Sequence, residues 1–192
     1  MKSLEPEIEM KTIDGRALRV ARWRAHGTGR TERPLLFFSG IGANIELIAP
    51  FAARLSNRDV VTFDMPGIGG SPEPTLPYRP WMMARIADKL MDDLGYDKID
   101  VMGVSWGGGL AQQFAFQYGK RVGKLILAAT SAGMVMVPGK LSALSKMADP
   151  RRYIDPSFME KNFRTLYGGS TDGSDGHMSR IKAPSTKGYL YQ

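Results

Sequence analysis

The chain has 192 residues, of which 43% are hydrophobic and 23% charged, so it is long enough for one domain with a substantial core. It contains no cysteine, which excludes disulfides and thiolate metal sites and is consistent with a reducing cytosol. No apolar run resembles a secretory signal or reaches the length of a bilayer span. We therefore expect a cytoplasmic protein without a transmembrane segment.

The net charge is +7, and arginines gather in the first 33 residues. They are not interleaved with aromatic residues on one element, as a nucleic-acid surface would require. The pattern favours a solvated basic face, with attraction to an anionic surface left open. No nucleic-acid partner is expected.

The first half of the chain predicts strands and one helix. Residues 7–12 and 18–23 form two strands around an Asp14-Gly15 turn. The continuous apolar run 34–38 predicts a strand buried on both faces, and 59–64 predicts another. Between them we expect a helix over 45–55, interrupted or kinked at Pro50.

The second half continues this alternation. Helical spacing of apolar residues over 79–94 and 106–118 flanks a short apolar strand at 99–104, and a further buried strand is predicted at 124–129. Such alternation predicts an α/β fold with a mostly parallel sheet and helices on both faces. After residue 130 only helical pieces, near 141–147 and 157–167, are expected. We interpret 1–130 as the core and 131–192 as a partial helical cap.

The pentapeptide Gly103-Val104-Ser105-Trp106-Gly107 falls where the predicted strand turns into the predicted helix. A G-x-S-x-G sequence in that position is typical of a sharp turn that lifts a serine hydroxyl above the sheet. The helix that follows supplies N–H groups and a positive dipole end. Ser105 is therefore the candidate nucleophile, and the alternative is a tight structural turn with an idle serine.

A serine nucleophile also needs donors for the oxyanion. The loop after the third strand, Ser39-Gly40-Ile41, is the expected source of one donor, the backbone N–H of Ile41, and the N–H of Trp106 is the other. The alternative is a glycine turn chosen only for its shape.

The partners of the serine are less evident. Acid and histidine are expected after the serine, in that order. His26 precedes Ser105, and His177 lies in a polar stretch with no strand before it, which favours a solvated loop histidine. Asp64 precedes the serine and is expected to fix a loop through backbone N–H groups. We expect the catalytic histidine and acid beyond Gln192.

The sequence gives little support for a nucleotide, metal or cofactor site. The glycine-rich segment that begins at Gly40 lacks the third glycine of a dinucleotide-binding fingerprint. The segment that begins at Gly67 lacks the lysine of a P-loop. No metal or organic cofactor is expected. Met134 and Met136 fit either a pliable apolar cleft or plain core.

These motifs together resemble the α/β-hydrolase superfamily. The segments 38–44, 63–71 and 103–108 carry that resemblance. More narrowly, 40–47, 104–114, 128–140, 147–153 and 167–169 resemble the intracellular depolymerases of medium-chain-length polyhydroxyalkanoates. The resemblance implies an α/β-hydrolase fold with a partial cap, lacking its last strands. The predicted strand at 124–129 would then have no neighbour on one side and form an open parallel edge.

The resemblance also implies a function. Ser105 would cleave ester bonds of a polyhydroxyalkanoate polyester, in contact with granules of that polymer, with no cofactor. A chain without the catalytic histidine and acid would be inactive. The alternatives are a non-catalytic granule-binding remnant, or an esterase or lactonase acting on a small ester.

Overall fold

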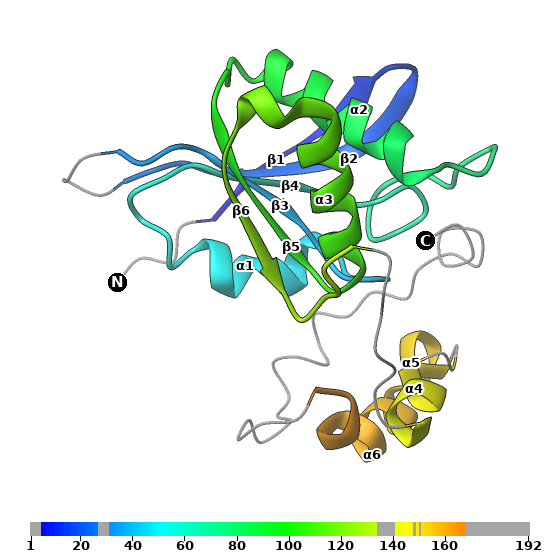
Figure 1. Cartoon of the computed structure of the whole chain (residues 1–192). Coiled ribbons are helices and arrows are strands. Elements are labelled where there is room, and N and C mark those ends of the chain that lie inside the picture. Colours follow the sequence, from blue (N-terminus) through cyan, green and yellow to red (C-terminus); the bar gives the residue numbers. More distant parts are fainter. Residues whose placement is uncertain (1–4, 27–30, 134–140, 148, 150, 168–192) are drawn as a thin grey trace.

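The computed structural model describes residues 5–26, 31–133, 141–147, 149 and 151–167. Its centre is a six-stranded mixed sheet with helices on both faces (Figure 1). The strands are β1 (Glu7–Ile13), β2 (Arg16–Trp23), β3 (Leu35–Phe38), β4 (Val60–Phe63), β5 (Ile99–Val104) and β6 (Val122–Ala128). The helices are α1 (Ile45–Ala52), α2 (Pro80–Asp93), α3 (Trp106–Tyr118), α4 (Leu141–Met147), α5 (Arg151–Ile154) and α6 (Pro156–Tyr167), and a 3₁₀ turn (Gly119–Arg121) precedes β6.

The strands run in the order β1-β2-β4-β3-β5-β6. Strands β4, β3, β5 and β6 are parallel to one another, whereas β1 and β2 form an antiparallel hairpin, and β2 pairs antiparallel with β4. At the hairpin turn, Asp14 and Gly15 have φ of 52° and 76°, the left-handed values that a type I′ turn requires. The predicted turn and the mostly parallel sheet are thus confirmed.

Each face of the sheet has its own apolar core. Helices α2 and α3 cover one face through buried side chains that include Met83, Leu90 and Phe114. Helix α1 covers the other face, where Ile45 and Ile48 pack with sheet residues. Because both faces are covered, the central strands are mostly apolar, and every residue of β3 and β4 is buried, Thr62 included.

Helix α1 is shorter than predicted. It ends at Ala52 rather than at residue 55, and it contains Pro50. Beyond it, the N–H groups of Arg54 and Leu55 bond carbonyls only three residues back. The chain therefore tightens into turns after Ala52, so the helix predicted to be interrupted or kinked at Pro50 continues past the proline and ends shortly beyond it.

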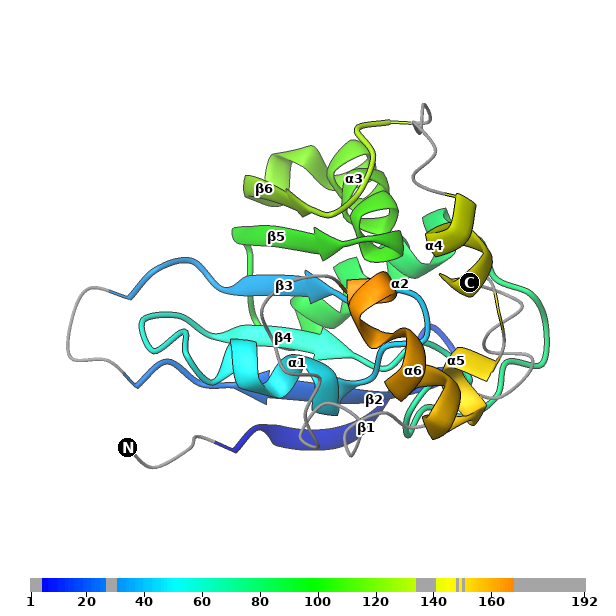
Figure 2. The same cartoon turned by 90° about the horizontal axis from the view of Figure 1, so that it is seen from below.

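The helices α4, α5 and α6, which we call the C-terminal helices, lie beside the carboxyl ends of β3, β4 and β5 (Figure 2). Two of them are close to the predicted helices at 141–147 and 157–167, and the short α5 was not predicted. The residues predicted as a cleft or core, Met134 and Met136, lie outside the described residues.

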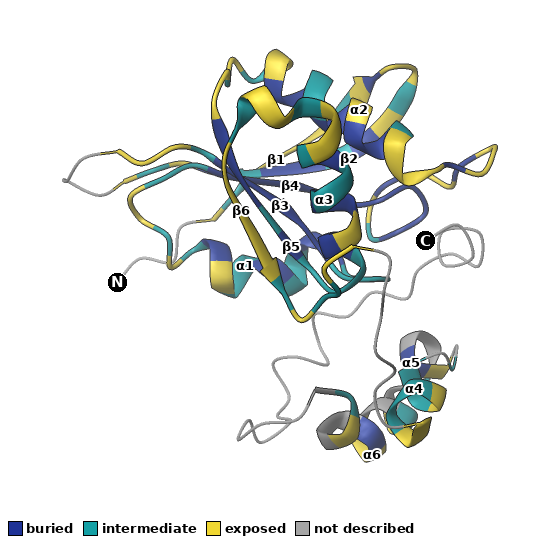
Figure 3. Ribbon diagram, in the orientation of Figure 1, coloured by how far each residue is buried: buried dark blue, intermediate teal, exposed yellow. Residues whose placement is uncertain are grey.

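The strand at 124–129 is not buried as its apolar pattern alone predicted, but it does form the open edge expected of a fold that lacks its last strands. Leu125, Ile126 and Leu127 of β6 are 39%, 39% and 37% exposed, and the strand shows as an exposed ribbon at the side of the sheet (Figure 3). The physical reason is its position, since among the described strands β6 has a neighbour on one side only. Its outer edge therefore presents unpaired backbone groups next to aliphatic side chains.

This open edge predicts that the 192-residue polypeptide, by itself, associates in solution. The double substitution Leu125→Lys/Leu127→Lys should weaken the association by about tenfold or more, because lysines disfavour edge-to-edge pairing. Sedimentation velocity over a concentration series measures the effect. Leu76→Lys, which changes an exposed leucine in the loop before α2, is the matched control. A wild-type chain that stays monomeric at all concentrations would contradict the prediction.

Candidate active site

Ser105 occupies the corner between β5 and α3 in a strained backbone conformation. Its φ and ψ are 54° and −120°, and it is one of three non-glycine residues with positive φ among those described. Holding such a conformation costs about 1–3 kcal/mol. The Ser105 N–H donates to the Ala128 carbonyl at 3.0 Å, and its own carbonyl accepts from Gly108 N–H at 2.9 Å. The corner is thus fixed from β6 on one side and α3 on the other.

The two glycines of the pentapeptide are required by close backbone approach. A Cβ on Gly103 would lie 2.2 Å from the Gly107 carbonyl oxygen. A Cβ on Gly107 would lie 2.2 Å from the Phe38 carbonyl oxygen and 2.4 Å from that of Ser39. The pattern G-x-S-x-G therefore follows from how tightly β5, α3 and the end of β3 pack around Ser105.

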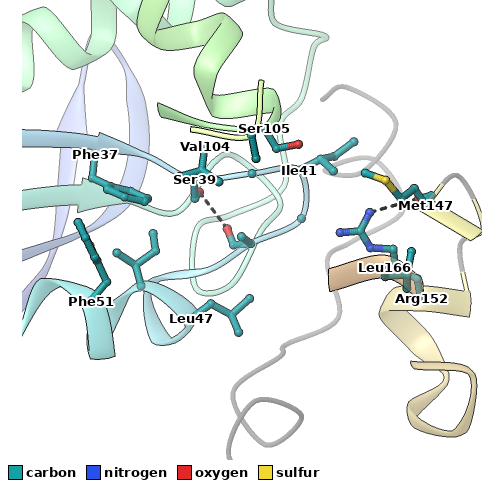
Figure 4. A pocket seen from close by; sticks show the side chains of 15 residues that line it. Phe37, Ser39, Ile41, Leu47, Phe51, Val104, Ser105, Met147, Arg152 and Leu166 are labelled. Atoms are coloured by element: carbon teal, nitrogen blue, oxygen red, sulfur yellow. Dashed lines mark hydrogen bonds between the residues drawn. The ribbon is translucent and has the colours of Figure 1, made fainter. Parts of the chain in front are cut away.

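The register of the sheet brings the predicted oxyanion loop to this corner. Phe38, the last residue of β3, pairs with Gly103 of β5. The loop that follows β3 therefore starts beside the turn that carries Ser105, and a Cβ on Gly40 would lie 3.6 Å from the Ser105 Cβ. Ile41 lies next to Ser105 in Figure 4. On the other side, Trp106 is the first residue of α3, where an N–H has no partner within its own helix.

Asp64 holds the far end of the same loop. Its carboxylate accepts from the N–H groups of Ile45 and Gly70, both at 2.8 Å, and pairs with Arg19 at 3.1 Å. Burial raises the pKa of the Asp64 carboxyl, while these three donors oppose that shift. The predicted loop-fixing role of Asp64 is confirmed, and the side chain is fully buried in this position.

The one histidine in the described part of the chain, His26, does not lie at the corner. His26 follows β2, whose last residue Trp23 pairs with Val60 at the start of β4. That is the amino end of the parallel strands, opposite the carboxyl end where Ser105 lies. His177 lies outside the described residues. Within the described part of the chain, no imidazole can accept the Ser105 proton.

A cavity of about 530 Å³ opens beside Ser105 (Figure 4). Its described lining is mostly apolar and comes from the β3 loop, α1, the corner after β5 and the C-terminal helices. The residues are Phe37, Ser39, Gly40, Ile41, Gly42, Ala43, Leu47, Ile48, Phe51, Val104, Ser105, Ala129, Met147, Arg152 and Leu166. A smaller cavity of about 280 Å³ also reaches Ser105, between Trp106 and Ser131.

Several lining residues were missed by the sequence analysis. Leu47 and Phe51 are one helical turn apart on α1, on a second apolar stripe beside the one that faces the sheet. That spacing was visible in the sequence, but nothing local distinguishes a cavity wall from core. Nothing in the sequence around Arg152 indicated that it lines a cavity, because only the tertiary fold brings α5 there.

No group of three or more His, Cys, Asp or Glu in the described part of the chain is arranged to hold a metal ion. None of the helices described there has the length and apolarity of a bilayer span.

The packing around Gly107 makes a direct prediction. Gly107→Ala should destabilise the fold by about 3 kcal/mol or more, because its methyl group would overlap two backbone carbonyls. The matched control is Gly109→Ala in the same helix, where a Cβ meets nothing within 4 Å. That change should stabilise by about 0.5–1 kcal/mol. Urea unfolding compares the two, and equal effects would contradict the described packing.

The hydrogen bonds and ion pair of Asp64 lead to a second prediction about stability. Asp64→Asn should cost about 2–4 kcal/mol at neutral pH, because an amide cannot replace the carboxylate toward all three donors. Asp93→Asn, which disturbs only an exposed pair with Lys11, should cost less than about 1 kcal/mol. Thermal or urea unfolding measures both, and a cost for Asp64→Asn as small as that of the control would refute the anchor.

Comparison with known proteins connects this geometry to a family. The family described as alpha/beta hydrolase fold matches residues 33–167. A poly(3-hydroxyalkanoate) depolymerase from Ectopseudomonas oleovorans is 47% identical over 164 residues, which are 83% of this chain and 58% of the relative. A 2-hydroxy-6-oxononadienedioate/2-hydroxy-6-oxononatrienedioate hydrolase from Burkholderia vietnamiensis is 34% identical over 129 residues, covering 62% of this chain and 43% of the relative.

Solved structures share the fold at low sequence identity. A bacterial membrane phospholipase A superposes with a TM-score of 0.72 at 21% identity, covering 97% of this chain and 59% of its own. A carboxylesterase from Bacillus subtilis superposes with a TM-score of 0.68 at 17% identity, covering 93% of this chain and 60% of its own. The chain thus spans a little under two thirds of the length of the depolymerase and of these two structures. The chain belongs to the alpha/beta hydrolase fold family.

Proposed function

We propose that the protein is a serine hydrolase that cleaves ester bonds of a polyhydroxyalkanoate polyester, with Ser105 as the nucleophile. The observation that carries this proposal is the strained Ser105 beside the Gly40–Ile41 loop, on the wall of an apolar cavity. The 47% identity to a poly(3-hydroxyalkanoate) depolymerase supports the choice of substrate.

In the proposed reaction the Ser105 hydroxyl attacks the ester carbonyl while a base takes its proton. The negative charge that forms on the carbonyl oxygen is stabilised by the N–H groups of Ile41 and Trp106, each of which contributes about 10²–10³ in rate. The alcohol end leaves, and water then hydrolyses the acyl-enzyme to release a hydroxyacid. No cofactor takes part in this scheme.

The base and its acid are assigned to segments outside the described residues. The support is that His26 lies at the opposite end of the strands and Asp64 is held by three donors. The depolymerase relative is longer than the part that this chain matches. We propose that a histidine and an acid from such additional segments complete the site.

The surroundings of the site fit a polyester. We propose that 1–130 form the hydrolase core and 131–192 part of a cap over Ser105, because Met147, Arg152 and Leu166 line the same cavity as the serine. The apolar lining suits aliphatic side chains of the polymer. We place the protein in the cytoplasm at polymer granules, which the net charge of +7 would help it approach.

A second candidate is a granule-binding protein without turnover. It is favoured by one observation, that no histidine in the described part of the chain is near Ser105. Without a base, a serine hydrolase loses on the order of 10⁶ in turnover. Labelling with a fluorophosphonate separates the candidates, since only a complete triad makes Ser105 react rapidly.

The test uses the protein extended to the length of its depolymerase relative. This protein should be labelled at Ser105 and should hydrolyse a medium-chain hydroxyalkanoate oligomer, whereas Ser105→Ala should lose labelling and about 10⁶ of turnover. Ser142→Ala, at an exposed position of α4, is the control and should retain both. Hydrolysis that persists unchanged in Ser105→Ala would refute the assignment.

A further inference from the structure

One end of the cavity beside Ser105 is purely apolar. The lining residues that belong to the sheet or to α1 carry no polar side-chain atom; they are Phe37, Leu47, Ile48, Phe51 and Val104. In Figure 4 the two phenylalanines lie at this end, and Ser105 lies between them and Met147 of the C-terminal helices. A ligand held at Ser105 can therefore extend an aliphatic chain toward the phenylalanines without burying a polar group there.

The two phenylalanines at this end differ in burial. Their ring centroids lie 5.4 Å apart, within the range of packed aromatic pairs. Phe37 is buried in the apolar core between the sheet and α1, whereas Phe51 is 38% exposed. Since Phe51 lines the cavity and also contacts solvent, its ring separates the end of the cavity from the surrounding water.

Helix α1 does not depend on the Phe51 ring for its place on the sheet. The helix packs through its buried residues Ile45, Ile48 and Ala52, and its first N–H is held by the Asp64 carboxylate. Substitutions of partly exposed side chains away from such contacts usually cost little stability. A change at Phe51 should therefore alter the length of the cavity and leave α1 in position.

We infer that Phe51 sets the length of the aliphatic chain that the cavity accepts. The aliphatic side chain of one hydroxyacyl unit runs from Ser105 past Leu47, and its terminal methyl group contacts the Phe51 ring. Each methylene that fits inside the cavity leaves water and strengthens binding about fourfold, whereas a methylene beyond the ring adds nothing. This inference rests on the proposed function, because it takes the ligand to be an acyl chain held at Ser105.

The test measures binding by the 192-residue chain, with the primary alcohols from butanol to decanol as probes. Isothermal titration calorimetry should show affinity that rises about fourfold per methylene and then levels off at one chain length. Phe51→Ala opens the end of the cavity, so affinity should go on rising for about two further methylenes or more. Phe51→Trp enlarges the wall, so affinity should level off at a shorter chain.

Phe116→Ala is the matched control, because Phe116 is 87% exposed on α3 and is not among the described lining residues. It should level off at the wild-type length. Affinity that levels off at the wild-type length in both Phe51 variants would overturn the inference, and if one variant does not fold, the other decides. Wild-type affinity that does not rise with chain length would overturn it as well.

The two proposals fail in different ways, because primary alcohols are not hydrolysed and their binding does not depend on turnover. An extended protein that hydrolyses no ester, while the Phe51 variants shift the length at which affinity levels off, would refute the proposed function alone. Hydrolysis that depends on Ser105, without a shift in either Phe51 variant, would refute only the role of Phe51.

Discussion

The strained corner at Ser105 is the constraint on which the rest of the site depends. A serine at φ of 54° persists only where its surroundings hold it, and here they do so from three directions. The N–H of Ser105 is bonded to β6, its carbonyl to the first turn of α3, and Gly107 is pressed against the carbonyls that end β3. Because each contact comes from a different element, the corner forms only when the sheet and α3 have assembled.

The same assembly determines what surrounds the serine. The pairing of Phe38 with Gly103 places the β3 loop next to the corner, and Asp64 fixes the loop where it enters α1. Helix α1 then contributes one wall of the cavity, and the C-terminal helices contribute the opposite wall. The site is thus a product of sheet register, in which a neighbouring strand supplies the loop and a buried carboxylate holds it still.

Much of this arrangement could be predicted from the sequence, because it is encoded locally. The apolar runs predicted the strands, and the helical spacing of apolar residues predicted α2 and α3. The two glycines on either side of Ser105 predicted the sharp turn between β5 and α3. The role of Asp64 followed from its position at a strand end before a glycine-rich loop. In each case the residues that carry the signal are close together in the chain.

What the sequence did not reveal depends on tertiary contacts. The exposure of β6 could be predicted only from the resemblance, which implies that the last strands are lacking, because Leu125 and Ile126 by themselves have the pattern of a buried strand. The sequence predicted a disturbance of α1 at Pro50, but not that the helix would end at Ala52, where backbone turns replace it. Arg152 looks like its neighbour Arg151 in the sequence, and only the fold turns one inward and leaves the other in solvent.

The central claim is that Ser105 presents its hydroxyl to a point served by two backbone N–H groups. A crystal structure of the extended protein with a phosphonate bonded to Ser105 tests it most directly. A phosphonyl oxygen should lie about 2.7–3.1 Å from the amide nitrogens of both Ile41 and Trp106. A phosphonate oxygen that contacts neither amide, or a phosphonate bonded to a different serine, would show that this corner is not an oxyanion site.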